Sequence, residues 1–385
     1  MNILFYMPTV LIGGVRRVTE ILSNKLREKG YTVTWLLLYR VYGDERDFPE
    51  SQNCVYLPSK ELLSKENIEF YHNFLKKHNI EIIINQNGLY EGVELIDTAR
   101  TENINIISVL HNNPIMGFQW LWQDVLILRN RSFIEKLKLV ARILLYRRTK
   151  QIIKSGIIRQ FKLLKKGKSH INVLSPRYID TVQKIDPTLC DISAIANPNT
   201  YTEVRNCPKE KIVLYVGRLE NRSKRLQLLI GIWKRIANEV QDWKLIIVGE
   251  GMDKSMLEKQ ADRIKNIEFV GYQDPRSYYE RASILCMTSL YEGFPMTLTE
   301  GMQHGCVPMA FDSFAAVHDI MTSGVDGEII EAFDTKTYSK KLLNLIKDEA
   351  YRKRLSDQAR INVQRYDCNQ IIDQWEELFR KLTAQ

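Results

Sequence analysis

The chain has 385 residues; 44% are hydrophobic, 26% are charged, and only 30 are glycine or proline. This composition excludes a disordered, collagen-like or low-complexity chain, and the length suits about two domains. No run of about 18 apolar residues occurs, so we expect no membrane-spanning helix, and the N-terminus resembles a strand more than a signal peptide. Six scattered cysteines without a C-x-x-C pair disfavour disulfides and zinc ribbons and favour a reducing cytosol.

The net charge of +9 is concentrated in one segment. Residues 129–168 hold fourteen Lys or Arg and a single acid, so the rest of the chain has a charge of −4. Apolar residues recur there at helical spacing in two stripes: Phe133, Leu137, Val140 and Leu144, then Ile153, Ile157, Phe161 and Leu164. A basic amphipathic helix pair favours an anionic membrane surface, and a solvated helical surface is the alternative. Nucleic acid is disfavoured because no aromatic residues are interleaved for base stacking.

The first half of the chain alternates strands with helices. A helix over residues 15–29 follows the first strand and ends at Gly30. The expected strands are residues 2–7, 32–39, 80–85, 104–110 and 170–174. This rhythm predicts a doubly wound parallel sheet, followed by a turn-rich connector near residue 200.

The same pattern starts again at Lys211. A helix is expected over residues 226–240, and the expected strands are residues 212–216, 244–248, 267–270, 284–287 and 307–310. We therefore predict an N-terminal Rossmann-like domain at 1–198, a C-terminal one at 199–368, and a last helix within 369–385 that packs back onto one of them. Ligands of such sheets bind beyond the carboxyl ends of the strands, so the loops that follow strands should carry the site.

The segment from Ser289 to Gly305 is the most informative of these loops. Glu292 follows a predicted strand, and Pro295 suits the start of a helix. The amides of Met296, Thr297 and Leu298 would then form an anion site, with Glu300 one turn further on. A carboxylate on each side of a bound phosphate suits a sugar nucleotide. The alternative is that both glutamates only favour a helix N-terminus.

Two further loops carry candidate ligand-binding residues. Arg218 follows a strand that ends at Gly217, and together with Lys224 it suits the binding of a diphosphate. The alternative is that Arg218 only forms an ion pair on the surface. Gly13 and Gly14 follow the first strand and allow a ligand to approach the backbone closely. They do not form G-x-G-x-x-G, so a nicotinamide or flavin cofactor is not supported.

His111 follows another predicted strand and lies at the same kind of edge, where it is either a site residue or a structural histidine. Phe118, Trp120 and Trp122 come next and suit sugar stacking, a membrane interface or core packing. No Asp-x-Asp and no His/Cys cluster with metal spacing occurs, so we expect neither a metal nor a cofactor.

Together these residues resemble the retaining glycosyltransferases of family 4, which have the GT-B architecture of two Rossmann-like domains facing across a cleft. The resemblance runs from Asn2 to about Tyr366. Its motifs are Glu292-x7-Glu300, Gly217-Arg218-Leu219, Lys224, Val248-Gly249-Glu250-Gly251 and Gly305-x-x-Pro308.

The resemblance implies a role for each matching residue. Glu292 and His111 would face the reacting sugar, and Glu300 would hold the nucleotide ribose. Arg218 and Lys224 would bind the diphosphate, over which the Gly13–Gly14 loop would close. The remaining donor-binding positions are Val270 and Tyr272 near the base, and Gly293, Phe294, Pro295, Met296, Thr297 and Leu298 at the helix start.

The implied reaction is metal-independent transfer of a hexosyl unit, with retention, from a nucleoside diphosphate sugar. UDP is favoured over GDP, and the acceptor would be a saccharide or a lipid-linked saccharide in capsule, O-antigen or related polysaccharide synthesis. The enzyme would be cytoplasmic, and residues 129–168 would hold it at the inner face of the cell membrane. The alternatives are a sugar-nucleotide epimerase of the same fold and a catalytically silent accessory subunit.

Overall fold

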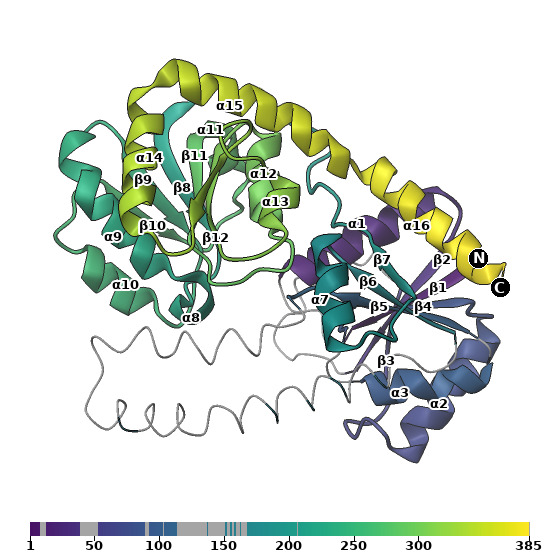
Figure 1. Ribbon diagram of the computed structural model, residues 1–385. Coiled ribbons are helices and arrows are strands. Elements are labelled where there is room, and N and C mark those ends of the chain that lie inside the picture. The colour runs from purple at the N-terminus through teal and green to yellow at the C-terminus, as the bar shows by residue number, and fades with distance from the viewer. Residues whose placement is uncertain are drawn as a thin grey trace. The chain divides into compact units, whose positions relative to one another are not determined.

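The computed structural model describes residues 1–7, 13–38, 53–88, 92–102, 104–113, 168–205 and 207–384, with single positions between 137 and 162. The chain divides into two compact units (Figure 1). The first is Met1–Ala196 with Ile372–Gln385, and the second is Asn197–Ile371. Each unit is built on one parallel sheet with helices between its strands, which confirms the predicted fold class of two doubly wound α/β domains.

The sheet of the first unit has the strand order β3-β2-β1-β4-β5-β6-β7. Its strands are β1 (Asn2–Met7), β2 (Thr32–Leu37), β3 (Cys54–Tyr56), β4 (Ile82–Asn85), β5 (Asn105–Leu110), β6 (Ser169–Val173) and β7 (Ile192–Ala194). Its described helices are α1 (Gly14–Glu28), α2 (Lys65–Lys77), α3 (Val93–Thr98), the short η2 (Ala99–Glu102) and α7 (Arg177–Ile185).

Alternate residues of these strands feed two apolar layers. Leu4 and Leu36 pack with Tyr71 of α2 and Leu95 of α3 on one face. On α1, Ser23 accepts a 2.7 Å hydrogen bond from the buried indole of Trp35.

The last helix, α16 (Cys368–Thr383), contacts the first unit through its later turns. Lys29 Nζ lies 2.7 Å from both Asp373 and Glu376, and the ring of Tyr31 meets Phe379 edge-on at 6.1 Å. Residues 372–385 are therefore part of the first unit, although they follow the second along the chain.

The sheet of the second unit has the order β10-β9-β8-β11-β12-β13. Its strands are β8 (Glu210–Val216), β9 (Lys244–Val248), β10 (Ile267–Gly271), β11 (Ala282–Met287), β12 (Val307–Asp312) and β13 (Glu328–Glu331). Its helices are α8 (Asn221–Lys224), α9 (Leu226–Ile236), η4 (Ala237–Glu239), α10 (Lys254–Ala261), α11 (Arg276–Arg281), α12 (Met296–Gln303), α13 (Val317–Ile320), α14 (Thr335–Lys347), α15 (Glu349–Asn362) and η5 (Val363–Tyr366).

Helices cover this second sheet on both faces (Figure 1). Trp233 of α9 and Leu342 of α14 are fully buried in one core cluster with Val213 and Ile284. Gly301 of α12 lies so close to the other face that a Cβ there would stand 2.6 Å from Cδ2 of Leu285. Glycine at 301 therefore allows α12 to pack directly against β11.

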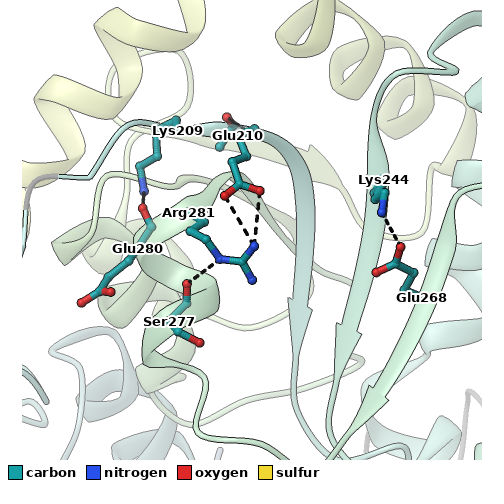
Figure 2. A network of polar contacts seen from close by, with 8 residues as sticks. Lys209, Glu210, Lys244, Glu268, Ser277, Glu280 and Arg281 are labelled. Carbon is teal, nitrogen blue, oxygen red and sulfur yellow. Dashed lines mark hydrogen bonds and ion pairs between the residues drawn. The ribbon is translucent and has the colours of Figure 1, made fainter.

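Polar contacts link neighbouring elements near the amino ends of the strands in the second sheet (Figure 2). Glu210 at the start of β8 pairs with Arg281 at 3.3 Å, and Lys244 at the start of β9 pairs with Glu268 at 2.6 Å. Lys209 Nζ donates to the carbonyl of Glu280 at 3.0 Å. The opposite, carboxyl edge carries the candidate site residues.

The apolar runs correctly located the longer strands, and the structure differs from prediction at weaker signals. The predicted 226–240 helix ends at Ile236 and continues as the 3₁₀ turn η4, because the backbone amide of Val240 bonds to Ala237. The short strands β3, β7 and β13 were not predicted. Each has three or four residues and lies next to a single neighbour at the end of its sheet's strand order.

Candidate active site

The candidate site of the second unit lies where the order of its sheet reverses. After β8 the chain continues to β9 on one side, while β11 pairs with β8 on the other. Loops that leave two such neighbouring strands in opposite directions form the usual ligand crevice of an open α/β sheet. Here Arg218 follows β8, and Ser289 and Glu292 follow β11.

Lys224 and Glu292 form an ion pair at this position. Lys224 Nζ lies 2.6 Å from Glu292 Oε1, and the two side chains are 21% and 13% exposed. Ser289 donates its hydroxyl to the same carboxylate oxygen at 2.6 Å. The structure thus joins two predicted site residues that lie 68 positions apart in the sequence.

The backbone fixes Lys224 in place. Its helix α8 ends at Lys224, and the next residue, Arg225, adopts a left-handed conformation with φ of 53°. The Thr288 hydroxyl is within 3.2 Å of the carbonyls of both Lys224 and Arg225, and the amide of Leu290 donates to Ser223 at 2.7 Å. These contacts hold α8 against the loop that carries Glu292.

The side chain of Arg218 extends from the same edge of the sheet and is much more exposed to solvent than those of Lys224 and Glu292. Its side chain is 76% exposed and lies 3.6 Å from Glu220. The surrounding backbone is closely packed, since Gly217 donates to Val248 at 3.0 Å and Leu219 donates to Glu250 at 2.8 Å. A Cβ at Gly249 would stand 2.0 Å from the carbonyl oxygen of Gly217, and one at Gly251 would stand 2.5 Å from that of Leu219. Both glycines of this motif are therefore required by the packing of the loop.

The start of α12 is largely buried. Pro295 precedes the helix in an extended conformation, and the amide of Leu298 donates to its carbonyl at 3.1 Å. An anion site here would therefore rest on the amides of Met296 and Thr297. Phe294 is 5% exposed and packs edge-on against Tyr366 at 5.0 Å, so its side chain belongs to the core. Gly293 is also buried.

Glu300 lies one turn into α12 and is 5% exposed. Its Oε1 accepts a hydrogen bond from the hydroxyl of Thr200 at 2.7 Å, and its Oε2 accepts one from the hydroxyl of Tyr279 at 2.8 Å. Val270, at the end of β10, is half-buried, and Tyr272 beyond it is 66% exposed. Among the predicted donor-binding residues of the second unit, Lys224 lies in the short helix α8 and Val270 lies in β10. The others lie in loops that follow strands or in the first turns of α12.

The candidate residues of the first unit lie at the corresponding edge of its own sheet. His111 follows β5, and its Nε2 is 2.6 Å from the side-chain oxygen of Gln86, which follows β4. Burial lowers the pKa of His111 to about 4. The ring is therefore neutral near pH 7, and it donates its Nε2 proton to Gln86 in this arrangement.

Gly13 precedes α1 with φ of 167°, which is extended backbone, and the amide of Arg17 donates to its carbonyl. A Cβ at Gly13 would meet no atom within 4 Å. Gly14 is the first residue of α1. The described structure therefore leaves open space beside the first turn of this helix.

Sequence comparison finds a likeness in the second unit: residues 201–362 match the family of glycosyl transferases group 1. An uncharacterized glycosyltransferase of Haemophilus influenzae is 30% identical over 191 residues, which cover 48% of this chain and 54% of that protein. The chain spans about half the length of the first curated relatives that it matches.

Two solved structures share the fold over almost the whole chain. The lipopolysaccharide outer core galactosyltransferase WaaB matches with a TM-score of 0.70 and 18% identity, covering 99% of this chain and 100% of WaaB. Anabaena HepE in complex with UDP matches with a TM-score of 0.77 and 14% identity, again covering 99% and 100%. These likenesses confirm the predicted GT-B fold.

Several residues that hold the candidate site together were not predicted. Thr200 and Tyr279 bond to Glu300 in the second unit, and Gln86 bonds to His111 in the first unit. Gln86 could have been found, because it is a polar residue directly after a buried strand. Thr200 and Tyr279 belong to no motif and lie 100 and 21 residues from Glu300.

Some predictions lie outside the described residues. Phe118, Trp120, Trp122 and almost all of the basic segment 129–168 are among them. Within the part that is described, no helix has the length and apolarity needed to cross a membrane. The described residues also include no group of three or more His, Cys, Asp or Glu that could hold a metal ion.

Proposed function

We propose that this chain is a retaining, metal-independent glycosyltransferase. It would transfer a hexosyl unit from a nucleoside diphosphate sugar to a saccharide or lipid-linked saccharide acceptor in surface polysaccharide synthesis. The observation that carries the proposal is the Lys224–Glu292 pair at the reversal of strand order, with Glu300 on the adjoining helix, in a segment that matches the glycosyl transferases group 1 family.

The proposed chemistry follows from the charges at this edge. Departure of a nucleoside diphosphate leaves negative charge on the phosphate oxygens, and fixed cations and helix amides stabilise such charge. Lys224 and Arg218 supply the cations, and Met296 and Thr297 supply amides. Glu292 would face the donor sugar as an electrostatic and positioning group. The departing phosphate would accept the proton of the acceptor hydroxyl as the new bond forms on the same face, which retains the configuration.

UDP is the proposed nucleotide, with GDP as the second choice. HepE was solved with UDP, and that likeness supports uridine as the base to test first. Val270 and Tyr272 would lie near the base. In the first unit, neutral His111 would lie near the reacting sugar, and the Gly13–Gly14 loop would close over the phosphates.

Thermal unfolding with nucleotides tests the donor site. A nucleoside diphosphate at about 100 times its Kd should stabilise the protein by ~2.7 kcal/mol, which raises Tm by a few degrees. UDP should give this shift, and Glu300→Ala should remove it. Glu268→Ala is the matched control, because Glu268 is an exposed, ion-paired carboxylate of the same unit. If UDP, GDP and ADP all leave the Tm of the wild-type protein unchanged, the proposal is contradicted and an accessory subunit is favoured. An isomerised sugar nucleotide, formed with no acceptor present, would favour an epimerase.

We also propose that residues 129–168 bind an anionic membrane surface at the cytoplasmic face, where a lipid-linked acceptor would lie. The support is their charge of +13 and their amphipathic spacing. WaaB, which has a similar fold, is described as a lipopolysaccharide outer core galactosyltransferase.

Flotation with vesicles of anionic phospholipid at low salt tests this segment. Each basic residue near the surface contributes about 1 kcal/mol, so neutralising four should weaken binding by about two to three orders of magnitude. The test variant replaces Arg147, Arg148, Lys165 and Lys166 with glutamine. The control variant removes the same charge from exposed sites elsewhere: Lys65, Lys77, Lys259 and Lys265. Equal binding by the two variants would contradict the proposal.

A further inference from the structure

We propose that Tyr279 and Thr200 are positioning residues that fix the Glu300 carboxylate for the ribose hydroxyls of the donor. This inference rests on the proposed function and adds two residues to it. Glu300 faces one hydroxyl donor on each oxygen, at 2.8 Å from Tyr279 and 2.7 Å from Thr200. The two donors come from different parts of the chain, so together they define the plane of the carboxylate.

Both contacts are hydrogen bonds from neutral donors to an acceptor. An ionised carboxylate only accepts, and each of its oxygens has two lone-pair positions. One position on each oxygen is used by Tyr279 or Thr200. The second position on each oxygen can accept a hydroxyl of a ribose diol. The arrangement therefore orients Glu300 while leaving it able to bind the ligand.

Tyr279 is held firmly on α11. It is fully buried, and its ring stacks on His304 with centroids 5.7 Å apart and an interplanar angle of 21°. His304 in turn donates from Nδ1 to the carbonyl of Glu300 at 2.8 Å. Burial raises the pKa of Tyr279 well above its usual value, so its hydroxyl keeps the proton that it donates.

Thr200 is held by the helix that carries Glu300. Gln303 of α12 donates to the carbonyl of Tyr201 at 2.7 Å and accepts from its amide at 3.3 Å. Asn199, on the other side, bonds through its amide to the carbonyl of Tyr366 at 2.7 Å and through its side chain to that of Val363 at 2.9 Å. The segment around Thr200 is thus anchored at both ends, which directs the hydroxyl to Glu300.

Tyr279→Phe removes one donor and keeps the ring, and titration calorimetry measures the effect on nucleotide binding. A hydrogen bond to a charged group contributes more free energy than one between neutral groups. We therefore expect the Kd for UDP to rise about tenfold or more when this hydrogen bond is lost. Tyr278→Phe is the matched control, since Tyr278 is its neighbour on α11, is half-buried, and packs beneath Arg281 rather than against Glu300. It should leave the Kd unchanged.

A ligand lacking the ribose diol separates positioning from general damage. With 2′,3′-dideoxy-UDP, wild type and Tyr279→Phe should bind equally, because the contact that Glu300 makes is missing in both. Thr200→Val should behave like Tyr279→Phe, and Thr200→Ser should restore binding. GDP and its dideoxy counterpart are measured in parallel.

Two results would overturn the inference while leaving the donor site intact. One is an unchanged Kd for UDP in Tyr279→Phe, and the other is an equal loss for UDP and its dideoxy analogue. If the wild-type protein binds neither UDP nor GDP, the proposed function itself fails and the inference falls with it.

Discussion

Lys224→Ala is expected to lower the rate of sugar transfer at least a hundredfold and to destabilise the second unit. The rate falls because a fixed cation next to the departing diphosphate is lost, and removing one such stabilising group costs about 10²–10³ in kcat. Stability falls because Glu292 is only 13% exposed and loses its ion pair with Lys224. The hydrogen bond from Ser289 to Glu292 remains. The rate is measured as UDP released from a UDP-sugar, and stability is measured by urea unfolding.

The chain contains a matched control for this change. Lys254 lies 2.6 Å from Glu250, the same separation as in the Lys224–Glu292 pair, but these side chains are 31% and 47% exposed. Exposed ion pairs contribute about 0–1 kcal/mol, so Lys254→Ala should change neither the rate nor the stability by much. Equal effects of the two substitutions would contradict the role given to Lys224. The double variant Lys224→Ala/Glu292→Ala should regain stability without regaining activity.

The fold could be predicted wherever burial leaves a continuous signal. β1 and β9 are almost wholly buried, and their apolar runs give both bounds correctly. β3 and β7 are half-buried along their whole length and have three residues each, which is too short for a period to be visible. Such strands form because a neighbouring strand offers them hydrogen bonds, and that neighbour cannot be read from the local sequence.

For the candidate site, the sequence predicts where Glu292 and Lys224 lie along the chain but not that they contact each other. Each comes after a strand, which is a local feature. Their contact depends on β8 lying next to β11, an adjacency of elements far apart in the sequence. The prediction gave Lys224, together with Arg218, a role in binding the diphosphate, and it did not include the ion pair with Glu292 that the described structure shows. Thr200 and Tyr279 are beyond any local rule for the same reason.

Lowering the pH from 7 to 4.5 is expected to destabilise the first unit by about 2 to 3 kcal/mol through His170 alone. His170 lies on β6, is 4% exposed, and its Nε2 has no hydrogen-bond partner in the described structure. The pKa of His170 is lowered to about 4, mainly by burial; the nearby Asp191 raises it and Lys381 lowers it, each by less than burial does. The ordinary value in an unfolded chain is about 6.5.

The direction of this change in stability depends on whether the folded or the unfolded protein binds the proton. Above about pH 7.5 the histidine is almost entirely neutral in both states, so it contributes almost no pH dependence there. Between pH 6.5 and 4 the unfolded chain takes up a proton that the folded chain does not, so stability falls as the pH falls.

Urea unfolding of wild type and His170→Leu at several pH values isolates this effect, since other groups titrate alike in both. Leucine cannot be protonated and suits a buried strand. The variant should therefore lose less stability than wild type between pH 7 and 4.5, and the difference between the two should be nearly constant above about pH 7.5. Parallel curves throughout would mean that His170 is protonated in the folded protein as readily as in the unfolded chain. The sheet beside β6 would then have to admit water, which its fully buried neighbour Ile107 argues against.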